Sequence, residues 1–415
     1  MIIRFLASSL LLVLSLCLLG TGCSRSEPKP IRAGILYLRS GALADSERSM
    51  VQATTLALEE LQEQGGLLGR PLEIVISRES PGLEEFTEEA TRLIEEEEVE
   101  VLFGCWTSAS RKVVLPILQQ HRHLLFYPIQ YEGLEQSPYV VYTGAVPNQQ
   151  LVPAVKWALD NLGKRVFLVG SDYVYPHIAN QIARDQLGAL GAEVVGEEYI
   201  PFGGLQTAEV IASIQQTRPE VILNTINGDS NHAFFQALKE AELDHIPTMS
   251  TSIAEREFEE MGEFTPVGHY ATLSYFESLD SPQNRDFLKR FRKRFGVDRS
   301  VTASMESGYF SVFLWAQAVE AANSSAPEEV RKSIGGQSWA APEGIVSIDP
   351  GTGHTWKSVR VGRLNEQGQF EVQWSSVGPV RPRPYPTYQS KEVWDAKLLR
   401  LYEGWGESWI GESAP

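Results

Sequence analysis

The sequence predicts an α/β fold in which two doubly wound lobes are joined by a hinge. Short apolar runs alternate with segments of helical periodicity, which is the rhythm of a parallel sheet covered by helices on both faces. This rhythm occurs twice along the chain, before and after residues 147–148. The chain has 415 residues, more than one hydrophobic core usually supports.

The N-terminus predicts export and a lipid anchor. Arg4 precedes an apolar run at residues 10–19, which ends in Gly20-Thr21-Gly22-Cys23. So short a run, closed by small residues, is typical of a secretory signal rather than of a membrane span. We therefore expect a lipoprotein signal peptide at 1–23, lipidation of Cys23 and a linker at 24–30. Gly20 stands where an aliphatic residue is usual, so plain secretion and an uncleaved anchor remain alternatives.

The first α/β unit follows this linker. The expected strands are 31–38, 72–77, 99–105 and 124–129, and the expected helices are 50–61, 83–94 and 108–119. Each strand is a short apolar run, and each helix carries apolar residues at helical spacing. Because strands and helices alternate, the strands are expected to be parallel.

A second unit of the same kind starts after Pro147-Asn148. Helices are expected at 149–162, 178–190, 208–216 and 231–241, and strands at 166–171, 194–201, 221–225, 248–252 and 270–276. Two later helices, 284–295 and 303–322, carry apolar stripes that suit the first unit. The chain is therefore expected to cross between the lobes more than once.

These crossings give the expected domain organisation. The first lobe takes residues 31–147 plus about 277–345, and the second takes 148–276 plus about 346–385. Residues 386–415 form a C-terminal tail with three tryptophans, Trp394, Trp405 and Trp409, which is expected to pack against a lobe.

Composition and missing motifs exclude several classes of function. The formal net charge of −17 argues against nucleic-acid binding. Neither a dinucleotide-binding glycine motif nor a P-loop occurs, and the seven histidines are scattered, so no cofactor and no metal site is expected. Cys105 lies in an apolar stretch without a basic neighbour, which predicts a buried, unreactive thiol.

An enzyme is also not expected. Ser108, Ser110 and Lys112 are close enough to consider a Ser-Lys nucleophile. However, they open a helix, where serine is a common N-cap, and no GxSxG elbow occurs. A binding protein is the alternative that remains.

Ligands of open α/β sheets bind outside the carboxyl ends of the strands. The loops at those ends are 39–47, 106–110, 130–133, 172–176 and 227–231. They are rich in hydroxyls, amides and aromatic rings, which suits a small polar ligand.

Six blocks of sequence carry a resemblance to a known family. They are residues 103–112, 126–133, 142–144, 147–150, 171–176 and 225–231. Together they strongly resemble the substrate-binding subunit of urea ABC transporters, and weaker similarity runs from about Ile31 to Pro382. The resemblance implies a type I periplasmic-binding fold, an ABC transporter permease as partner and an extracytoplasmic location. The related cytoplasmic amide-sensing regulator lacks the Asn-Gly-Asp-Ser-Asn block and an export signal.

Urea is planar and neutral, and all its donors and its acceptor need partners once buried. In the first lobe, Ser108 is expected to donate to the carbonyl, Trp106 and Tyr127 to form flat walls, and Gln130 to donate and accept. The structural alternative for Trp106 and Tyr127 is core packing.

In the second lobe, Tyr173 and Tyr175 are expected to close over the ligand. Asp229, aided by Asn227, is expected to accept from an amino group, and Glu255 enters only through the resemblance. The structural alternatives are core packing for Tyr175, turn formation for Asn227 and helix capping for Asp229.

Two other binding functions remain open. An amino acid would use an acid for its ammonium group and donors for its carboxylate, although only Arg39 in these loops is a cation placed for that. A receptor module that reports urea or an amide without transporting it would use the same closed cleft.

Overall fold

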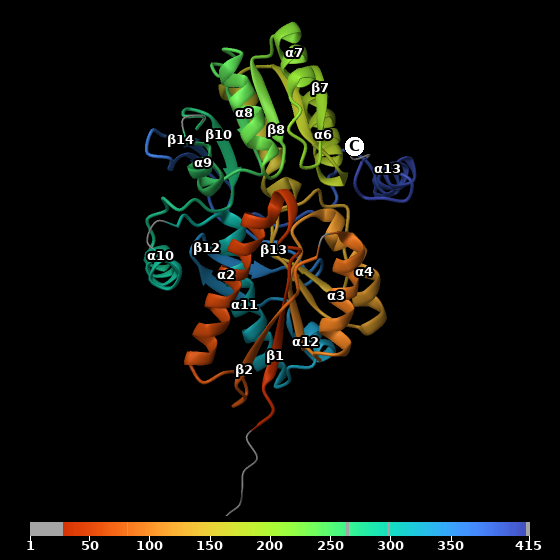
Figure 1. The fold of residues 1–415 in the computed structure, drawn as a ribbon, viewed down its shortest axis with the longest axis vertical. Coiled ribbons are helices and arrows are strands. Elements are labelled where there is room, and N and C mark those ends of the chain that lie inside the picture. The colour runs from red at the N-terminus through yellow and green to blue at the C-terminus, as the bar shows by residue number, and fades with distance from the viewer. Residues whose placement is uncertain (1–27, 81, 263–264, 297–298, 412–415) are drawn as a thin grey trace, which may run out of the picture.

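The computed structural model describes residues 28–80, 82–262, 265–296 and 299–411. Two α/β lobes lie one above the other in Figure 1, with α2, α3 and α4 on the lower lobe and α6, α7 and α8 on the upper one. The predicted fold class, two lobes with parallel sheets, is therefore confirmed.

The first lobe is built on a parallel sheet with strand order β2-β1-β3-β4-β5. Its strands are β1 (Ile31–Leu36), β2 (Leu72–Ile76), β3 (Val101–Gly104), β4 (Leu125–Tyr127) and β5 (Val140–Tyr142). Its helices are α2 (Ala44–Glu63), α3 (Leu83–Glu95), α4 (Ser108–His121), α10 (Pro282–Phe295), α11 (Ala303–Ala322) and α12 (Pro327–Ser333). Helices α10 and α11 pack against α2, so late segments of the chain complete this lobe.

The end of β3 depends on a glycine. A Cβ at Gly104 would lie 2.0 Å from the carbonyl oxygen of Leu36 on the neighbouring strand β1. Only glycine fits so close an approach. Cys105 follows with a positive φ of 64°, and its buried thiol has a raised pKa because of burial, as the sequence predicts for an unreactive thiol. This turn carries the chain from β3 to Trp106 and α4.

The second lobe has strand order β15-β14-β10-β9-β8-β6-β7. Its strands are β6 (Arg165–Asp172), β7 (Glu193–Pro201), β8 (Val221–Thr225), β9 (Thr248–Ser250), β10 (Tyr270–Leu273), β14 (Arg360–Leu364) and β15 (Phe370–Ser375). Its helices are α5 (Leu151–Asn161), α6 (Val174–Ala189), α7 (Ala208–Thr217), α8 (Ser230–Glu240) and α9 (Glu255–Met261). Strands β14 and β15 pair antiparallel, whereas β6 to β10 pair parallel.

The chain passes between the lobes after β5, after β10 and after a small antiparallel sheet. That sheet contains β11 (Ser338–Ala341), β12 (Gly344–Ile348) and β13 (Thr355–Trp356). The Tyr142 amide donates to the Gly353 carbonyl at 2.9 Å, which holds the segment before β13 beside β5 of the first lobe. The sequence predicts a lobe boundary near residue 345, and this boundary stays a prediction. The strand pairing puts the last passage between β13 and β14.

A buried lysine ties these passages together. The Lys357 Nζ donates to the Thr143 carbonyl at 3.0 Å and to the Ser307 hydroxyl at 2.8 Å, and it pairs with the Glu343 carboxylate at 2.9 Å. The next residue after Thr143 is Gly144, where a Cβ would lie 1.9 Å from the Ile129 carbonyl oxygen. Close backbone approach and a buried charge pair thus fix the start of the hinge.

The C-terminal segment packs on the second lobe. Helix α13 (Lys391–Gly404) lies against α6, and Trp394 is fully buried with its indole nitrogen donating to the Pro386 carbonyl at 3.0 Å. In the described part of the chain, we find no helix with the length and apolarity that a membrane crossing requires. The expected signal peptide and Cys23 lie outside the described residues.

Candidate ligand-binding cleft

A small pocket lies between the two lobes at the ends of β3, β9 and β10. From the first lobe it is lined by Trp106, Gln130 and residues 302–304 at the start of α11. From the second lobe it is lined by residues 252–254, Glu257 and Leu273. Its volume is about 20 Å³, which is enough for a water molecule and too little for a phenyl ring.

Two polar atoms of this pocket lack a hydrogen-bond partner. The indole nitrogen of Trp106 and the hydroxyl oxygen of Ser252 are both buried and unpaired within the described structure. Glu257 is already engaged, because its carboxylate accepts from the Ala254 amide at 2.9 Å. A buried donor without a partner costs about 1–3 kcal/mol, so a polar ligand that pairs with these groups would bind favourably.

The structure brings Trp106 and Gln130 together in this pocket but places Ser108 elsewhere. The Ser108 hydroxyl donates to the Glu132 carboxylate and accepts from Arg111 Nη1 at 3.2 Å. The N-cap of α4 is Thr107, whose hydroxyl accepts from the Ser110 amide at 2.9 Å, so the expectation of a serine cap is wrong by one residue. Ser108 therefore belongs to a buried charge network and not to the pocket lining.

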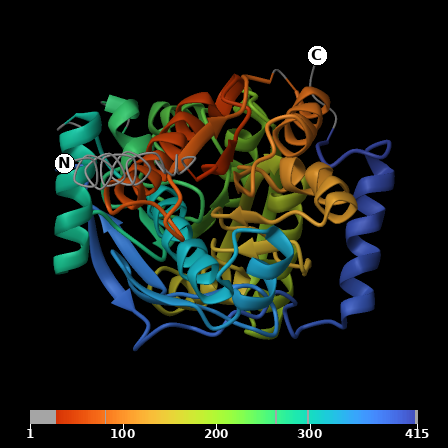
Figure 2. The ribbon, with the colours of Figure 1, turned by 90° about the horizontal axis from the view of Figure 1, so that it is seen from below.

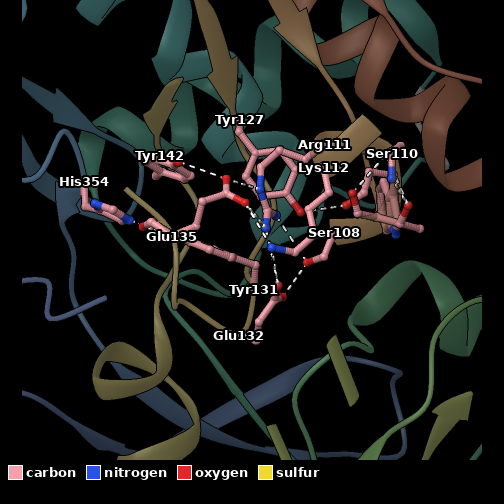
Figure 3. A network of polar contacts seen from close by, with 12 residues as sticks. Ser108, Ser110, Arg111, Lys112, Tyr127, Tyr131, Glu132, Glu135, Tyr142 and His354 are labelled. Atoms are coloured by element: carbon pink, nitrogen blue, oxygen red, sulfur yellow. Dashed lines mark hydrogen bonds and ion pairs between the residues drawn. The ribbon is translucent and has the colours of Figure 1, made fainter. Parts of the chain in front are cut away.

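That network, shown in Figure 3, joins the start of α4 to the chain between β4 and β5. Arg111 is wholly buried and donates through Nε to Glu135 at 2.8 Å and through Nη2 to Glu132 at 3.4 Å. Lys112 donates to Glu135 at 3.1 Å. Two cations thus face two carboxylates, so the cluster is neutral as a whole.

Aromatic side chains enclose the network. The guanidinium carbon of Arg111 lies 4.6 Å from the ring centre of Tyr127 and 4.3 Å from that of Tyr131. The Tyr142 hydroxyl donates to Glu135 at 2.9 Å, and the Tyr142 ring stacks on His354 at 4.1 Å. His354 stands just before β13, so the network reaches the last passage between the lobes (Figure 3).

Burial shifts the proton equilibria of this cluster. Burial alone would raise the pKa of Glu135, but the charges of Arg111 and Lys112 hold it down at about 2. Burial lowers the pKa of His354 to about 4, so this ring is neutral at pH 7. Its Nδ1 lies 2.9 Å from the Thr352 carbonyl and donates to it, which leaves Nε2 to accept from the Tyr131 hydroxyl.

Tyr127 has the contacts of a core residue. It is fully buried, and its hydroxyl donates to the Trp106 carbonyl at 2.9 Å. Burial raises the pKa of this hydroxyl far above its usual range. Tyr127 thus supports Trp106 from behind, which is the structural alternative considered for it.

The tyrosines of the second lobe lie side by side at the start of α6. Tyr173 and Tyr175 are nearly fully buried, with ring centres 6.2 Å apart, and the Tyr175 hydroxyl shares a hydrogen bond of 2.9 Å with Thr251. Asn227 shapes its own turn, since its amide N–H donates to Ser171 Oγ at 3.0 Å and its side chain donates to the Thr225 carbonyl at 3.2 Å. The turn alternative for Asn227 therefore accounts for its contacts.

The two predicted acids differ in environment. Asp229 precedes α8 and is exposed, and its carboxylate caps no helix amide, so the capping alternative is wrong. Its φ and ψ of −61° and −20° are already helical, which turns the side chain away from the capping geometry. Glu255 is fully buried at the start of α9, accepts from the Glu277 amide at 2.9 Å and does not line the small pocket.

A second, larger cavity of about 370 Å³ opens between the lobes near β1. It is lined by Leu38, Leu43 and Glu47 from the first lobe and by Phe202 from the second. Its walls are mostly apolar. Burial raises the pKa of Glu47 to about 7, although the Arg39 amide donates to this carboxylate.

Sequence reasoning missed several residues of this cleft. Ser252 and the start of α11 were outside the expected loops, because the strand pattern continued through 252 and α11 lies far along the chain. Arg111, Glu132 and Glu135 were not singled out from the sequence, since such residues are rarely buried unless paired. Only their spacing on either side of β4 gives a signal.

Known proteins resemble this chain over most of its length. A family model for the periplasmic binding protein domain matches residues 31–391. The Leu/Ile/Val-binding protein homolog 6 of Brucella abortus is 24% identical over 310 residues, which are 72% of this chain and 79% of that protein. A solute-binding protein of an ABC transporter from R. palustris, solved with 4-hydroxybenzoate, has a TM-score of 0.77 at 25% identity, covering 85% of this chain and 98% of that one.

A shorter match has a different name. Over 127 residues the chain is 32% identical to a limonene hydroxylase of Geobacillus stearothermophilus. This match spans 31% of the chain and 23% of that protein, so it covers less than a quarter of the relative's length. The long family match and the two-lobed topology agree with each other, and the chain therefore belongs to the periplasmic binding protein family.

Proposed function

We propose that this chain is an extracytoplasmic solute-binding protein that captures urea or a short-chain amide between its lobes and delivers it to an ABC transporter permease. The observation that carries the proposal is the small interlobe pocket with unpaired Trp106 Nε1 and Ser252 Oγ. Family membership and the R. palustris structure support the binding and transport part. On this proposal, the protein performs no chemistry on its ligand.

The pocket suits a small neutral ligand for three reasons. Trp106 Nε1 can donate to a carbonyl oxygen, and the Ser252 hydroxyl and the Gln130 amide can accept from amino hydrogens. The flat indole provides a wall for a planar group. The lining residues include no lysine and no arginine, so a carboxylate would find no counter-charge there.

Amino-acid binding is the second candidate, and specific observations favour it too. The Brucella relative is named for leucine, isoleucine and valine, and the larger cavity has apolar walls. Against it, Arg39, the cation that the sequence offers for a carboxylate, already donates to the Ser77 carbonyl. Sensing of an amide without transport would use the same pocket, and a membrane partner other than a permease would distinguish it.

A ligand panel tests the proposal. Thermal unfolding should be measured with urea, formamide, acetamide, guanidinium, leucine, valine and 4-hydroxybenzoate. A ligand present at a hundredfold excess over its Kd stabilises the fold by about 2.7 kcal/mol, and we expect this for urea or an amide. The Ser252→Ala variant should lose roughly tenfold in affinity, while Ser324→Ala, in the loop before α12, should not. Stabilisation by leucine or valine alone would replace the amide assignment with amino-acid binding.

The anchor needs its own experiment. If Cys23 is the lipidated mature N-terminus, mass spectrometry of the membrane-extracted protein should find a diacylglyceryl adduct on a chain that begins at Cys23. The Cys23→Ala variant should then leave the membrane fraction. A wild-type soluble product that begins at another residue would show secretion without an anchor.

A further inference from the structure

The last described residues form an isolated antiparallel bridge with the loop that follows β6. The Val174 amide donates to the Trp409 carbonyl at 3.1 Å, and the Gly411 amide donates to the Asp172 carbonyl at 3.0 Å. These two bonds flank an antiparallel bridge between Tyr173 and Ile410. The C-terminal segment therefore pairs directly with the tyrosine loop of the cleft.

This pairing is held in place on both sides. Helix α13 runs along the edge of the molecule in Figure 2 and leads the chain to Trp405, whose ring meets that of His177 edge-on at 5.0 Å. At the far end, a Cβ on Gly411 would lie 2.2 Å from the Asp172 carboxylate, which itself pairs with His177 Nε2 at 2.7 Å. The segment is thus closely fitted to the loop.

One residue of the segment also forms a wall of the cleft. Ile410 lines the larger interlobe cavity, opposite Leu38, Leu43 and Thr107 of the first lobe and beside Phe202 of the second. Its side chain adds apolar surface to a space that otherwise lies between the two lobes. A smaller side chain at 410 would enlarge that space.

The neighbouring residue reaches the first lobe. Lys112 Nζ lies 4.6 Å from the ring centre of Trp409, and the same ammonium donates to Glu135 of the buried network. The Trp409 ring packs on Tyr402 of α13 at 4.5 Å. A cation over an indole is worth about 0.5–2 kcal/mol, so this contact favours the arrangement in which the lobes meet.

We propose that Trp409, Ile410 and Gly411 are positioning residues of the cleft. They hold the Tyr173 loop in the position from which it closes over a bound ligand. The inference about the loop position is independent of the ligand, whereas its effect on affinity rests on the proposed amide function.

The first test uses the unliganded full chain. Gly411→Pro removes the amide that donates to Asp172, so hydrogen exchange at residues 172–176 should become about tenfold faster. The matched control is Leu399→Ala, a substitution on the exposed face of α13. Its exchange at 172–176 should match the wild type. Unchanged exchange in Gly411→Pro would overturn the positioning role, whatever the ligand is.

The second test measures the affinity for urea and acetamide by calorimetric titration. Gly411→Pro should weaken the binding of both by about tenfold, because the Tyr173 loop that closes over the ligand loses its support. Leu399→Ala should leave both affinities unchanged. Unchanged affinity in Gly411→Pro, with both ligands bound by the wild type, would remove the C-terminal segment from a role in binding. If the wild type binds neither probe, the amide function fails, and the exchange result alone decides the positioning role.

Discussion

Replacing Arg111 with methionine should lower the free energy of unfolding by about 3–5 kcal/mol. The guanidinium is fully buried between Glu132 and Glu135, and it also lies over the rings of Tyr127 and Tyr131. Methionine has a similar volume, so the loss comes from two carboxylates that remain buried beside one cation. Calorimetric melting of wild type and variant measures it.

Two controls separate charge from packing. Lys112→Met should cost less, because Arg111 still donates to both carboxylates. Adding Glu132→Gln to Arg111→Met should restore much of the lost stability, since Lys112 then compensates Glu135 and no uncompensated charge remains buried. A loss below 1 kcal/mol for Arg111→Met alone would contradict the role that we assign to this network.

The pH dependence of this effect has a definite sign. The pKa of Glu135 is about 2 in the folded protein and lies at its ordinary value in the unfolded chain. Its carboxylate therefore stabilises the fold above about pH 4.5, and this contribution is lost as the pH falls toward 2. The cost of Arg111→Met should accordingly shrink between pH 6 and pH 3.

The layered fold could be predicted from local patterns, while its edges could not. The strand 221–225 and the helix 303–322 have the bounds in the structure that their periodicity predicts, because each buries a continuous apolar face. Strand β5 has only three residues, and the later antiparallel strands are short and half exposed, so no local period marks them. Their pairing depends on neighbours that are far away in the sequence.

The cleft was predicted less completely than the fold, and the reason is physical. The rule that ligands lie at strand ends led to Trp106 and Gln130, which do line an interlobe pocket. The rule could not distinguish a residue that lines the pocket from one that packs behind it. Tyr127 was therefore expected to face the ligand, although its hydroxyl donates to the Trp106 carbonyl. The contribution of Ile410 had no signal at all, because it depends on where α13 docks.

The family resemblance pointed to Glu255 as a site residue but did not predict its buried, protonated state. It was expected only as a ligand contact, whereas the structure buries it against the hinge and leaves its Oε2 without a hydrogen-bond partner. Burial raises the pKa of Glu255 to about 8, despite the amide of Glu277 that donates to Oε1. At pH 7 this carboxyl therefore holds its proton and is neutral.

Replacing Glu255 with glutamine should flatten the fall in stability between pH 5 and pH 8. The unfolded chain releases this proton above about pH 4.5, but the folded protein keeps it up to about pH 8. The group's stabilising contribution is thus fully present below pH 4.5 and is lost as the pH rises to 8, a change of up to about 5 kcal/mol. Glutamine has no proton to release, so the stability of Glu255→Gln relative to the wild type should rise by that amount across this range.

Calorimetric melting at several pH values measures this difference in stability without a denaturant, which matters because urea is the proposed ligand. Glu240→Gln, an exposed change at the end of α8, is the control and should run parallel to the wild type. Parallel curves for Glu255→Gln as well would mean that Glu255 is ionised in the folded protein at neutral pH, and would contradict the raised pKa assigned to it.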